Sequence, residues 1–268
     1  MTALASRSAK QNEVDATINY FGPVDGIARI YGHDPASNYV NLQPHIMPVH
    51  NMSGSCEQPT LDREGFTLLH DIFTPASVEE VEASGPELVQ KLAGIVRNVT
   101  DCTMTVGVGA AVRRGGRSLG EVGSAPVHYT HVDVTPDAIL DLARELAPDA
   151  PPFRSVSMYN LWRPLTEMPL SDPLAMCDVR SVKPDDLERI HAHYRDGACR
   201  AAFMPRFNPE HRWCYFKDMS TEDGILFKSA ESDAGKTPPV AHTAFADMSV
   251  PLRRPRSSLE LRVLALWF

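Results

Sequence analysis

The sequence predicts a mainly β protein with flanking helices, built on a double-stranded β-helix (a jelly-roll, cupin-like core). From Thr103 onward, eight short runs rich in β-branched and aromatic residues are separated by turn residues; they centre on Val106, His128, Val156, Met176, Tyr215, Leu226, Ala241 and Leu261. These runs do not alternate regularly with helical stretches, which disfavours a parallel α/β sheet. A double-sheet roll of eight strands accommodates this pattern.

Composition and length restrict the class of protein further. The chain has 268 residues, enough for a substantial core, and a formal net charge of −8, which disfavours a nucleic-acid-binding role. No apolar run approaches the roughly 20 residues of a membrane helix, and no export signal is visible. Five cysteines without paired spacing predict free thiols in the cytoplasm. We expect a flexible tail over residues 1–15 and one domain over 16–268, with its jelly-roll core at about 103–268.

Helices are expected on both sides of the first core strand. Thr74-Pro75 predicts a helix to about Ala83, and after Gly85-Pro86 the apolar residues resume helical spacing at Leu88, Val89, Leu92, Ile95 and Val96. Thr135-Pro136-Asp137 predicts another helix start, followed by Ile139, Leu142, Ala143 and Leu146. A further helix is expected from Pro184. The arginine- and glycine-rich segment Arg113–Gly120 fits a solvated hairpin tip or, less well, a lid over an anionic substrate.

Three side chains form a candidate metal-ligand set. His131 and Asp133 lie two residues apart at the end of a strand-like run, and His242 lies on a later one. Residues two apart on a strand share a face but lie about 6.6 Å apart, so the chain must turn after His131 for both to bind one ion. The predicted helix start supplies that turn. Two imidazoles and one carboxylate are the ligands of non-haem iron(II) oxygenases.

The last strand carries candidate co-substrate residues. Arg256, Ser258 and Arg262 share one face of it. A buried arginine needs an anionic partner, and a dicarboxylate with one end on the metal suits it, through either Arg256 or Arg262. Asn160 and Trp162, which share a face of their own strand, either line that pocket or merely pack.

Other polar residues have simpler interpretations. His128 and His131 resemble a zinc pair, but residues three apart on a strand face opposite ways, so we expect His128 to be structural or to support the site. His191-x-His193 lies on the helix predicted from Pro184, where residues two apart do not share a face, and we expect it to be solvated. Lys228 is expected to make a structural ion pair.

Several sequence blocks resemble one protein family. They are His131-x-Asp133, Asn160–Leu165, Asp172–Asp178, Phe227-Lys228, Ala241–Phe245, Pro255–Arg262 and the early Ala16–Phe21. The chain resembles the fungal and bacterial hydroxylase/desaturase family that includes gibberellin desaturase-like and cephem-methoxylase-related proteins. The resemblance implies Fe(II), 2-oxoglutarate and O2, with the Arg-x-Ser motif at Arg256 and Ser258. Ser257 departs from the acidic residue expected there, but it points off the inferred ligand face.

The resemblance implies hydroxylation, desaturation or oxidative cyclisation of a small molecule, with neither nucleic acid nor membrane as partner. One alternative is a metal-dependent isomerase or hydrolase on the same roll that does not use 2-oxoglutarate. Another is a jelly roll that only binds. The oligomeric state cannot be read from the sequence.

Overall fold

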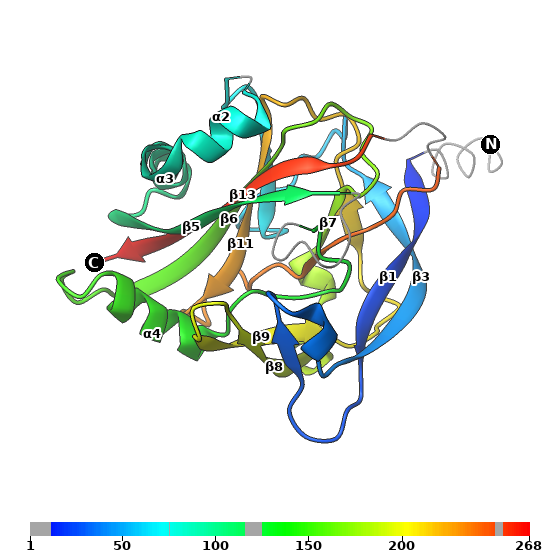
Figure 1. The fold of residues 1–268 in the computed structure, drawn as a ribbon, viewed down its shortest axis with the longest axis horizontal. Helices are drawn as coiled ribbons and strands as arrows, with labels where there is room; N and C mark the ends of the chain where they lie inside the picture. The colour runs from blue at the N-terminus through cyan, green and yellow to red at the C-terminus, as the bar shows by residue number, and fades with distance from the viewer. Residues whose placement is uncertain (1–11, 75, 116–124, 250–253) are drawn as a thin grey trace.

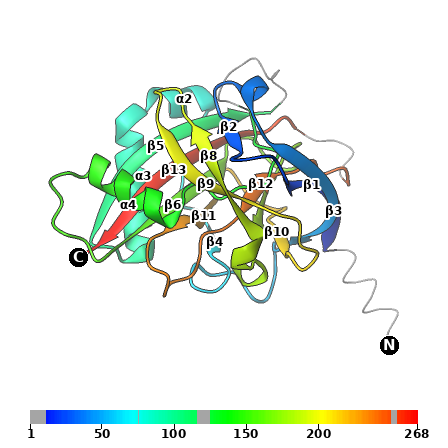
Figure 2. The same ribbon diagram turned by 90° about the horizontal axis from the view of Figure 1, so that it is seen from below.

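The computed structural model describes residues 12–74, 76–115, 125–249 and 254–268. One five-stranded sheet has the order β1 (Glu13–Gly22), β3 (Asn41–Asn51), β10 (Trp213–Tyr215), β7 (Leu174–Cys177) and β12 (His242–Ala244). The second has the order β4 (Phe66–Leu69), β11 (Gly224–Glu231), β6 (Ser155–Pro164), β13 (Ser257–Trp267) and β5 (Met104–Arg114). A small sheet contains β2 (Arg29–Tyr31), β8 (Leu187–His193) and β9 (Cys199–Pro205), and it lies in front in the view of Figure 2.

The two large sheets enclose an apolar core. Trp162 and Phe227 of the second sheet pack with Leu174 and Met176 of the first. Burying each such side chain stabilises the fold by about 1.5–3 kcal/mol. Strand β6 is buried at every position, because it lies between β11 and β13 and both of its faces are covered. The predicted mainly β jelly roll is confirmed.

Helices cover the second sheet on both faces (Figure 1). The pair α2 (Val78–Ala83) and α3 (Gly85–Thr100) lies on one face, where Leu92 packs with Leu261. Helix α4 (Pro136–Leu146) lies on the other, where Ile139 packs with Leu264. The predicted start of α4 is confirmed, with Pro136 in its first turn, although the Thr135 hydroxyl makes no capping hydrogen bond. Ser77, not Thr74, caps α2, through a reciprocal capping box with Glu80.

The helix predicted from Pro184 is wrong. Only a 3-10 turn covers Pro184–Asp186, and β8 follows it. Ile190 is buried while its neighbours Arg189 and His191 are more exposed, so the true period is two. Leu187 and Ile190, the two apolar residues that suggested a helix, were too few to distinguish the two periods.

The strand predicted around His128 is also not formed. His131 and Val132 make only isolated bridges, to His242 and Phe203 respectively. Among the described residues, the core from β5 to β13 therefore contains nine strands, because β8 and β9 are added and this one is lost. Strand β1 begins at Glu13, within the segment expected to be a tail, and residues 1–11 lie outside the described chain. Of the arginine- and glycine-rich loop, residues 116–120 also lie outside it.

Candidate metal centre

The three predicted ligands come together. One donor atom from each of His131, Asp133 and His242 lies within 4.8 Å of the other two. The His131 and His242 rings are 4.2 Å apart, and Nε2 of His131 is 3.8 Å from Oδ1 of Asp133. Two ligands at about 2.1 Å from one ion are roughly 3 Å apart, so a small contraction closes the set around a metal.

Backbone hydrogen bonds place the two imidazoles side by side. The His131 amide donates to the His242 carbonyl at 3.1 Å, and the His242 amide donates back at 2.9 Å. This reciprocal pair puts both side chains on one face. Val132 then turns away to pair with Phe203, and the chain enters α4 directly after Asp133 and Val134. The turn inferred from the helix start is what brings Asp133 back to the histidines.

The ring nitrogens are set for coordination. Nδ1 of His131 donates to the Tyr129 carbonyl at 3.0 Å, and Nδ1 of His242 donates to the Val240 carbonyl at 3.2 Å. A carbonyl only accepts, so Nδ1 carries the proton and Nε2 keeps a free lone pair in each ring. Burial, and secondarily the charge of His242, lower the pKa of His131 to about 4. The imidazole is therefore neutral at physiological pH, as a ligand must be.

Asp133 is held ionised by its neighbours. Burial by itself would raise its pKa, but the Arg262 guanidinium, the two imidazoles and Asn160 hold that pKa well below its usual value. Arg262 Nη2 lies 3.2 Å from Oδ1, and Asn160 Nδ2 donates to Oδ2 at 2.7 Å. Ser229 Oγ in turn donates to the Asn160 amide oxygen at 2.7 Å. Of the residues predicted to bind the co-substrate, Asn160 and Arg262 instead contact this candidate ligand.

Arg256 lies in the same cavity but on different partners. The cavity is lined by several residues of the site, among them His131, His242, Trp162, Phe227, Glu260 and Arg256. The Arg256 side chain is only 3% exposed; its Nε donates to Ser258 Oγ at 3.1 Å and its Nη1 to the Asp172 carbonyl at 2.8 Å. Within the described residues, no carboxylate lies in ion-pairing range of it. Burial, followed by repulsion from Arg113, lowers its pKa to about 10.

Trp162 adds a buried hydrogen-bond donor that no described residue uses. Its ring lies 5.5 Å from the Arg256 guanidinium carbon, and its buried Nε1 has no hydrogen-bond partner among the described residues. A buried hydrogen-bond donor without a partner destabilises the folded state. The indole N–H and the Arg256 cation in this cavity can therefore both bind the oxygen atoms of an anion.

Sequence reasoning missed some neighbours and interpreted others correctly. Glu260 pairs with Arg262 and lies 3.6 Å from Arg113, and the Phe227 ring lies 4.7 Å from that of His242. Glu260 shares strand parity with Arg256 and Arg262, which was the available signal. His128 supports the site from outside, through Asp172 at 3.1 Å. The ion pair expected of Lys228 is confirmed, with Glu231 at 2.9 Å.

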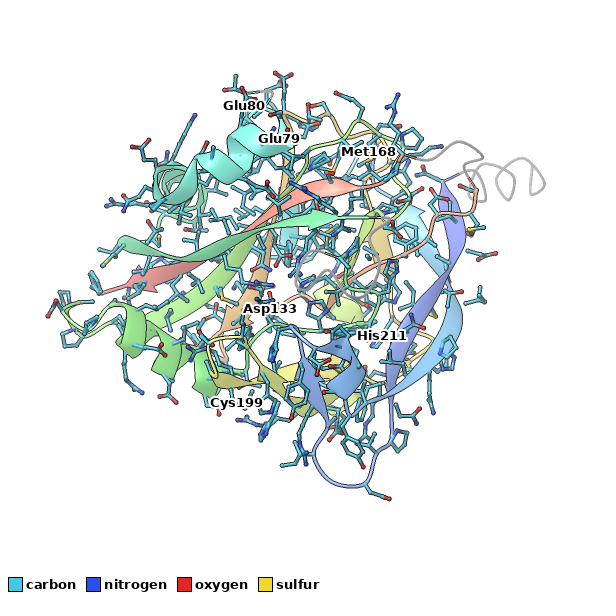
Figure 3. All side chains as sticks on the ribbon, viewed as in Figure 1. Glu79, Glu80, Asp133, Met168, Cys199 and His211 are labelled. Atoms are coloured by element: carbon cyan, nitrogen blue, oxygen red, sulfur yellow. The ribbon has the colours of Figure 1, made fainter. Side chains whose placement is uncertain are left out.

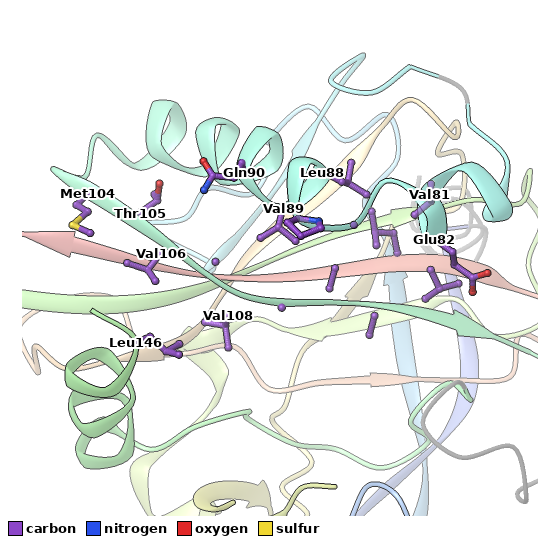
Figure 4. Close-up of a pocket in the computed structure, with 18 residues that line it drawn as sticks. Val81, Glu82, Leu88, Val89, Gln90, Met104, Thr105, Val106, Val108 and Leu146 are labelled. Carbon is purple, nitrogen blue, oxygen red and sulfur yellow. The ribbon is translucent and has the colours of Figure 1, made fainter. Parts of the chain in front are cut away.

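A larger groove lies elsewhere. It has a volume of about 770 Å³ and runs between α3 and β5, where Val89, Val106 and Val108 line it (Figure 4). Neither histidine nor cysteine is among its lining residues, so it lacks the donors of a metal centre.

Comparisons with known proteins indicate which proteins the chain is similar to. A family model described as "Oxidoreductase/YMDC permease-like domain" matches residues 18–266. The chain is 28% identical over 237 residues to the Fe(II)/2-oxoglutarate-dependent dioxygenase nvfI of Aspergillus novofumigatus, covering 84% of each chain. It is 25% identical over 283 residues to the hydroxylase/desaturase efuI of Hormonema carpetanum, covering 95% of each. The predicted resemblance to hydroxylase/desaturase proteins is confirmed.

A solved structure shares the fold. The iron and alpha-ketoglutarate-dependent endoperoxidase NvfI superposes with a TM-score of 0.82 at 23% identity, over 96% of this chain and 99% of that one. Among the described residues, no helix is both long and apolar enough to cross a membrane.

Proposed function

The chain belongs to the oxidoreductase/YMDC permease-like family. We propose that it is a non-haem Fe(II)- and 2-oxoglutarate-dependent oxygenase of a small molecule. One observation carries the proposal: Arg256 is a buried cation without a carboxylate partner among the described residues, in the cavity of His131 and His242. A buried charge without an opposite charge beside it carries an unfavourable desolvation free energy. A dicarboxylate with one end on the guanidinium and the other at the metal compensates it.

The residues divide the work. His131, Asp133 and His242 would hold Fe(II), since two neutral imidazoles and an ionised carboxylate are the donors of such sites. Arg262 and Asn160 orient the carboxylate of Asp133. When bound, Fe(II) would supply oxygen activation, with 2-oxoglutarate as the co-substrate that leaves as succinate and carbon dioxide.

The second set binds the co-substrate tail. Arg256 offers its guanidinium, Ser258 fixes the Nε end of that group, and Trp162 offers its unpaired indole N–H. Phe227, whose ring lies 4.7 Å from that of His242 at an interplanar angle of 58°, keeps that side of the site apolar. Exclusion of water matters because an activated site without substrate is open to side reactions.

The relatives' names support the class of reaction. They include a dioxygenase and a hydroxylase/desaturase, so the proposed outcome is hydroxylation, desaturation or oxidative cyclisation. We place the protein in the cytoplasm, because its five cysteines are all free thiols, as a reducing compartment requires.

Succinate release tests the proposal. Protein reduced and loaded with Fe(II) is incubated with 2-oxoglutarate in air, with and without a panel of small metabolites, and succinate is quantified by mass spectrometry. We expect succinate formation by the unmodified protein and background levels for His242→Ala and Arg256→Gln. Absence of succinate across the panel, combined with no measurable 2-oxoglutarate binding, contradicts the proposal. Turnover of a panel compound that persists without oxygen and 2-oxoglutarate indicates a metal-dependent isomerase or hydrolase.

A further inference from the structure

A second group of metal-ligating side chains lies on the hairpin formed by β8 and β9. One donor atom from each of His191, His193 and Cys199 lies within 4.8 Å of the other two. Nε2 of His193 is 3.8 Å from Sγ of Cys199. The two imidazoles are half-buried and the thiol is exposed, so an ion can enter from solvent. Figure 3 labels Cys199 at the start of β9, below Asp133 in that view.

Strand geometry explains why the three donors converge. His191 and His193 are two residues apart on β8 and therefore share a face. Cys199 is directly opposite His193 in the antiparallel β8–β9 pair, so its side chain projects on the same side. The turn between the strands is closed by the Tyr194 amide, which donates to the Ala198 carbonyl at 2.9 Å. This arrangement depends on β8 being a strand, which is why the helix expected there concealed it.

A neighbouring ring fixes one of the ligands. Tyr31 of β2 pairs with His193 across the small sheet, and the two rings stack 4.5 Å apart at an interplanar angle of 11°. The stack limits rotation of the His193 ring, so a ligand at this position loses little conformational freedom when it binds an ion.

We propose that His191, His193 and Cys199 form a second metal site, selective for a borderline-soft divalent ion such as Zn²⁺. Two imidazoles and a thiolate suit zinc, whereas calcium and magnesium require oxygen ligands. Tetrahedral N and S ligands at about 2.0–2.3 Å from zinc lie roughly 3.3–3.6 Å apart, close to the 3.8 Å between His193 and Cys199. Three protein ligands leave the fourth position for water.

The hairpin site is connected to the first centre through β9. Phe203, on the same strand as Cys199, exchanges backbone hydrogen bonds of 3.1 and 2.9 Å with Val132. Val132 lies between the two candidate ligands His131 and Asp133. Cys199 and Phe203 are four residues apart, or about 13 Å along the strand. Zn²⁺ on the hairpin therefore stabilises the small sheet that supports the first centre, by binding the folded state.

Cobalt(II) titration tests the site independently of oxygenase activity. The first centre contains no sulfur, so a thiolate-to-cobalt charge-transfer band reports on the hairpin alone. We expect the unmodified, phosphine-reduced protein to bind two equivalents of Co²⁺, one of them with the band. Cys199→Ser and His191→Asn should each lose the band and one equivalent. His242→Ala should keep the band and lose the other equivalent.

Cys56→Ser is the matched control, because Cys56 is also an exposed free thiol, and it should bind like the unmodified protein. Zn²⁺ added to His242→Ala protein should raise its melting temperature, and Cys199→Ser introduced into that variant should remove the rise. A folded protein that shows no thiolate band, or a band that survives Cys199→Ser, overturns the proposal and leaves the oxygenase assignment untouched.

Discussion

We expect Arg256→Gln to abolish tight 2-oxoglutarate binding while leaving the stability of the ligand-free protein nearly unchanged. The reason is that Arg256 is buried at 3% exposure without a carboxylate in range among the described residues. Its charge is therefore a cost to the free protein and a benefit only when an anion occupies the cavity.

The stability terms nearly cancel. The pKa of Arg256 falls from 12.5 to about 10. That fall corresponds to roughly 3 kcal/mol of unfavourable free energy for the charged form in the folded protein. Its hydrogen bonds to Ser258 and to the Asp172 carbonyl contribute about 1 kcal/mol each in the opposite direction. Glutamine removes both effects, so the free energy of unfolding should change by no more than about 1–2 kcal/mol.

The free energy of 2-oxoglutarate binding, by contrast, should change strongly in Arg256→Gln. Truncating one partner of a buried charged pair costs about 2–5 kcal/mol, which corresponds to a loss of affinity between about 30-fold and several thousand-fold. Arg256→Lys keeps the charge but loses the two-pronged fork, so an intermediate loss is expected.

Calorimetric titration of 2-oxoglutarate into Mn(II)-loaded protein measures the affinity, and thermal unfolding without ligand measures the stability. Arg254→Gln is the matched control, because Arg254 is exposed, lies two residues earlier, and its guanidinium donates to the carbonyls of Glu167 and Met168. Equal 2-oxoglutarate affinity in Arg256→Gln and in unmodified protein refutes the reasoning. The partner is then Arg262 if Arg262→Gln loses 2-oxoglutarate affinity while its Mn(II) affinity is retained.

Three further outcomes are expected. His242→Ala should lose tight binding of Fe(II) at the first centre, measured by metal titration with the hairpin site blocked by Cys199→Ser. Burial lowers the pKa of His211 below 6.5, although Asp186 partly opposes this shift. The unfolded state therefore binds more protons, and the free energy of unfolding falls as the pH drops below about 6.5. In denaturant titrations, His211→Asn should reduce that fall by up to about 1.4 kcal/mol per pH unit. A Cβ added at Gly107 would overlap Val89, so Gly107→Ala should lower the free energy of unfolding by about 1–3 kcal/mol.

Local signals in the sequence predicted local structure well. Pro136 in the first turn of α4 and the apolar spacing of α3 were sufficient, because caps and helical periods are short-range features. The segment after Pro184 defeated the same method. Its backbone partners are Arg29 on β2, which is distant in the sequence, and Phe203 on β9, the other strand of the hairpin. That pairing overrides the helical spacing of two apolar residues.

The sequence was sufficient to predict that the three candidate ligands lie together, but not which residues support them. His131 and Asp133 lie two residues apart, a spacing that indicates metal ligands when a turn follows. His242 was added because such a site needs a third donor. Asn160 and Arg262 reach Asp133 because they are directly opposite each other in the β6–β13 pair. That register joins two strands about a hundred residues apart in the sequence, and no residue type announces it.

The different roles proposed for Arg256 and Arg262 of β13 follow from the groups that each side chain contacts, because the residue type is the same. Both lie on one face of the strand, and sequence parity could not distinguish them. Arg262 contacts Asp133 and Glu260, so its charge is already compensated and its pKa is raised. Among the described residues, Arg256 donates hydrogen bonds only to a hydroxyl and a carbonyl, and its pKa is lowered. A charge that the protein itself leaves uncompensated is the one suited to bind an anion from solution, which supports Arg256 as the co-substrate residue and Arg262 as the residue that positions the metal ligand.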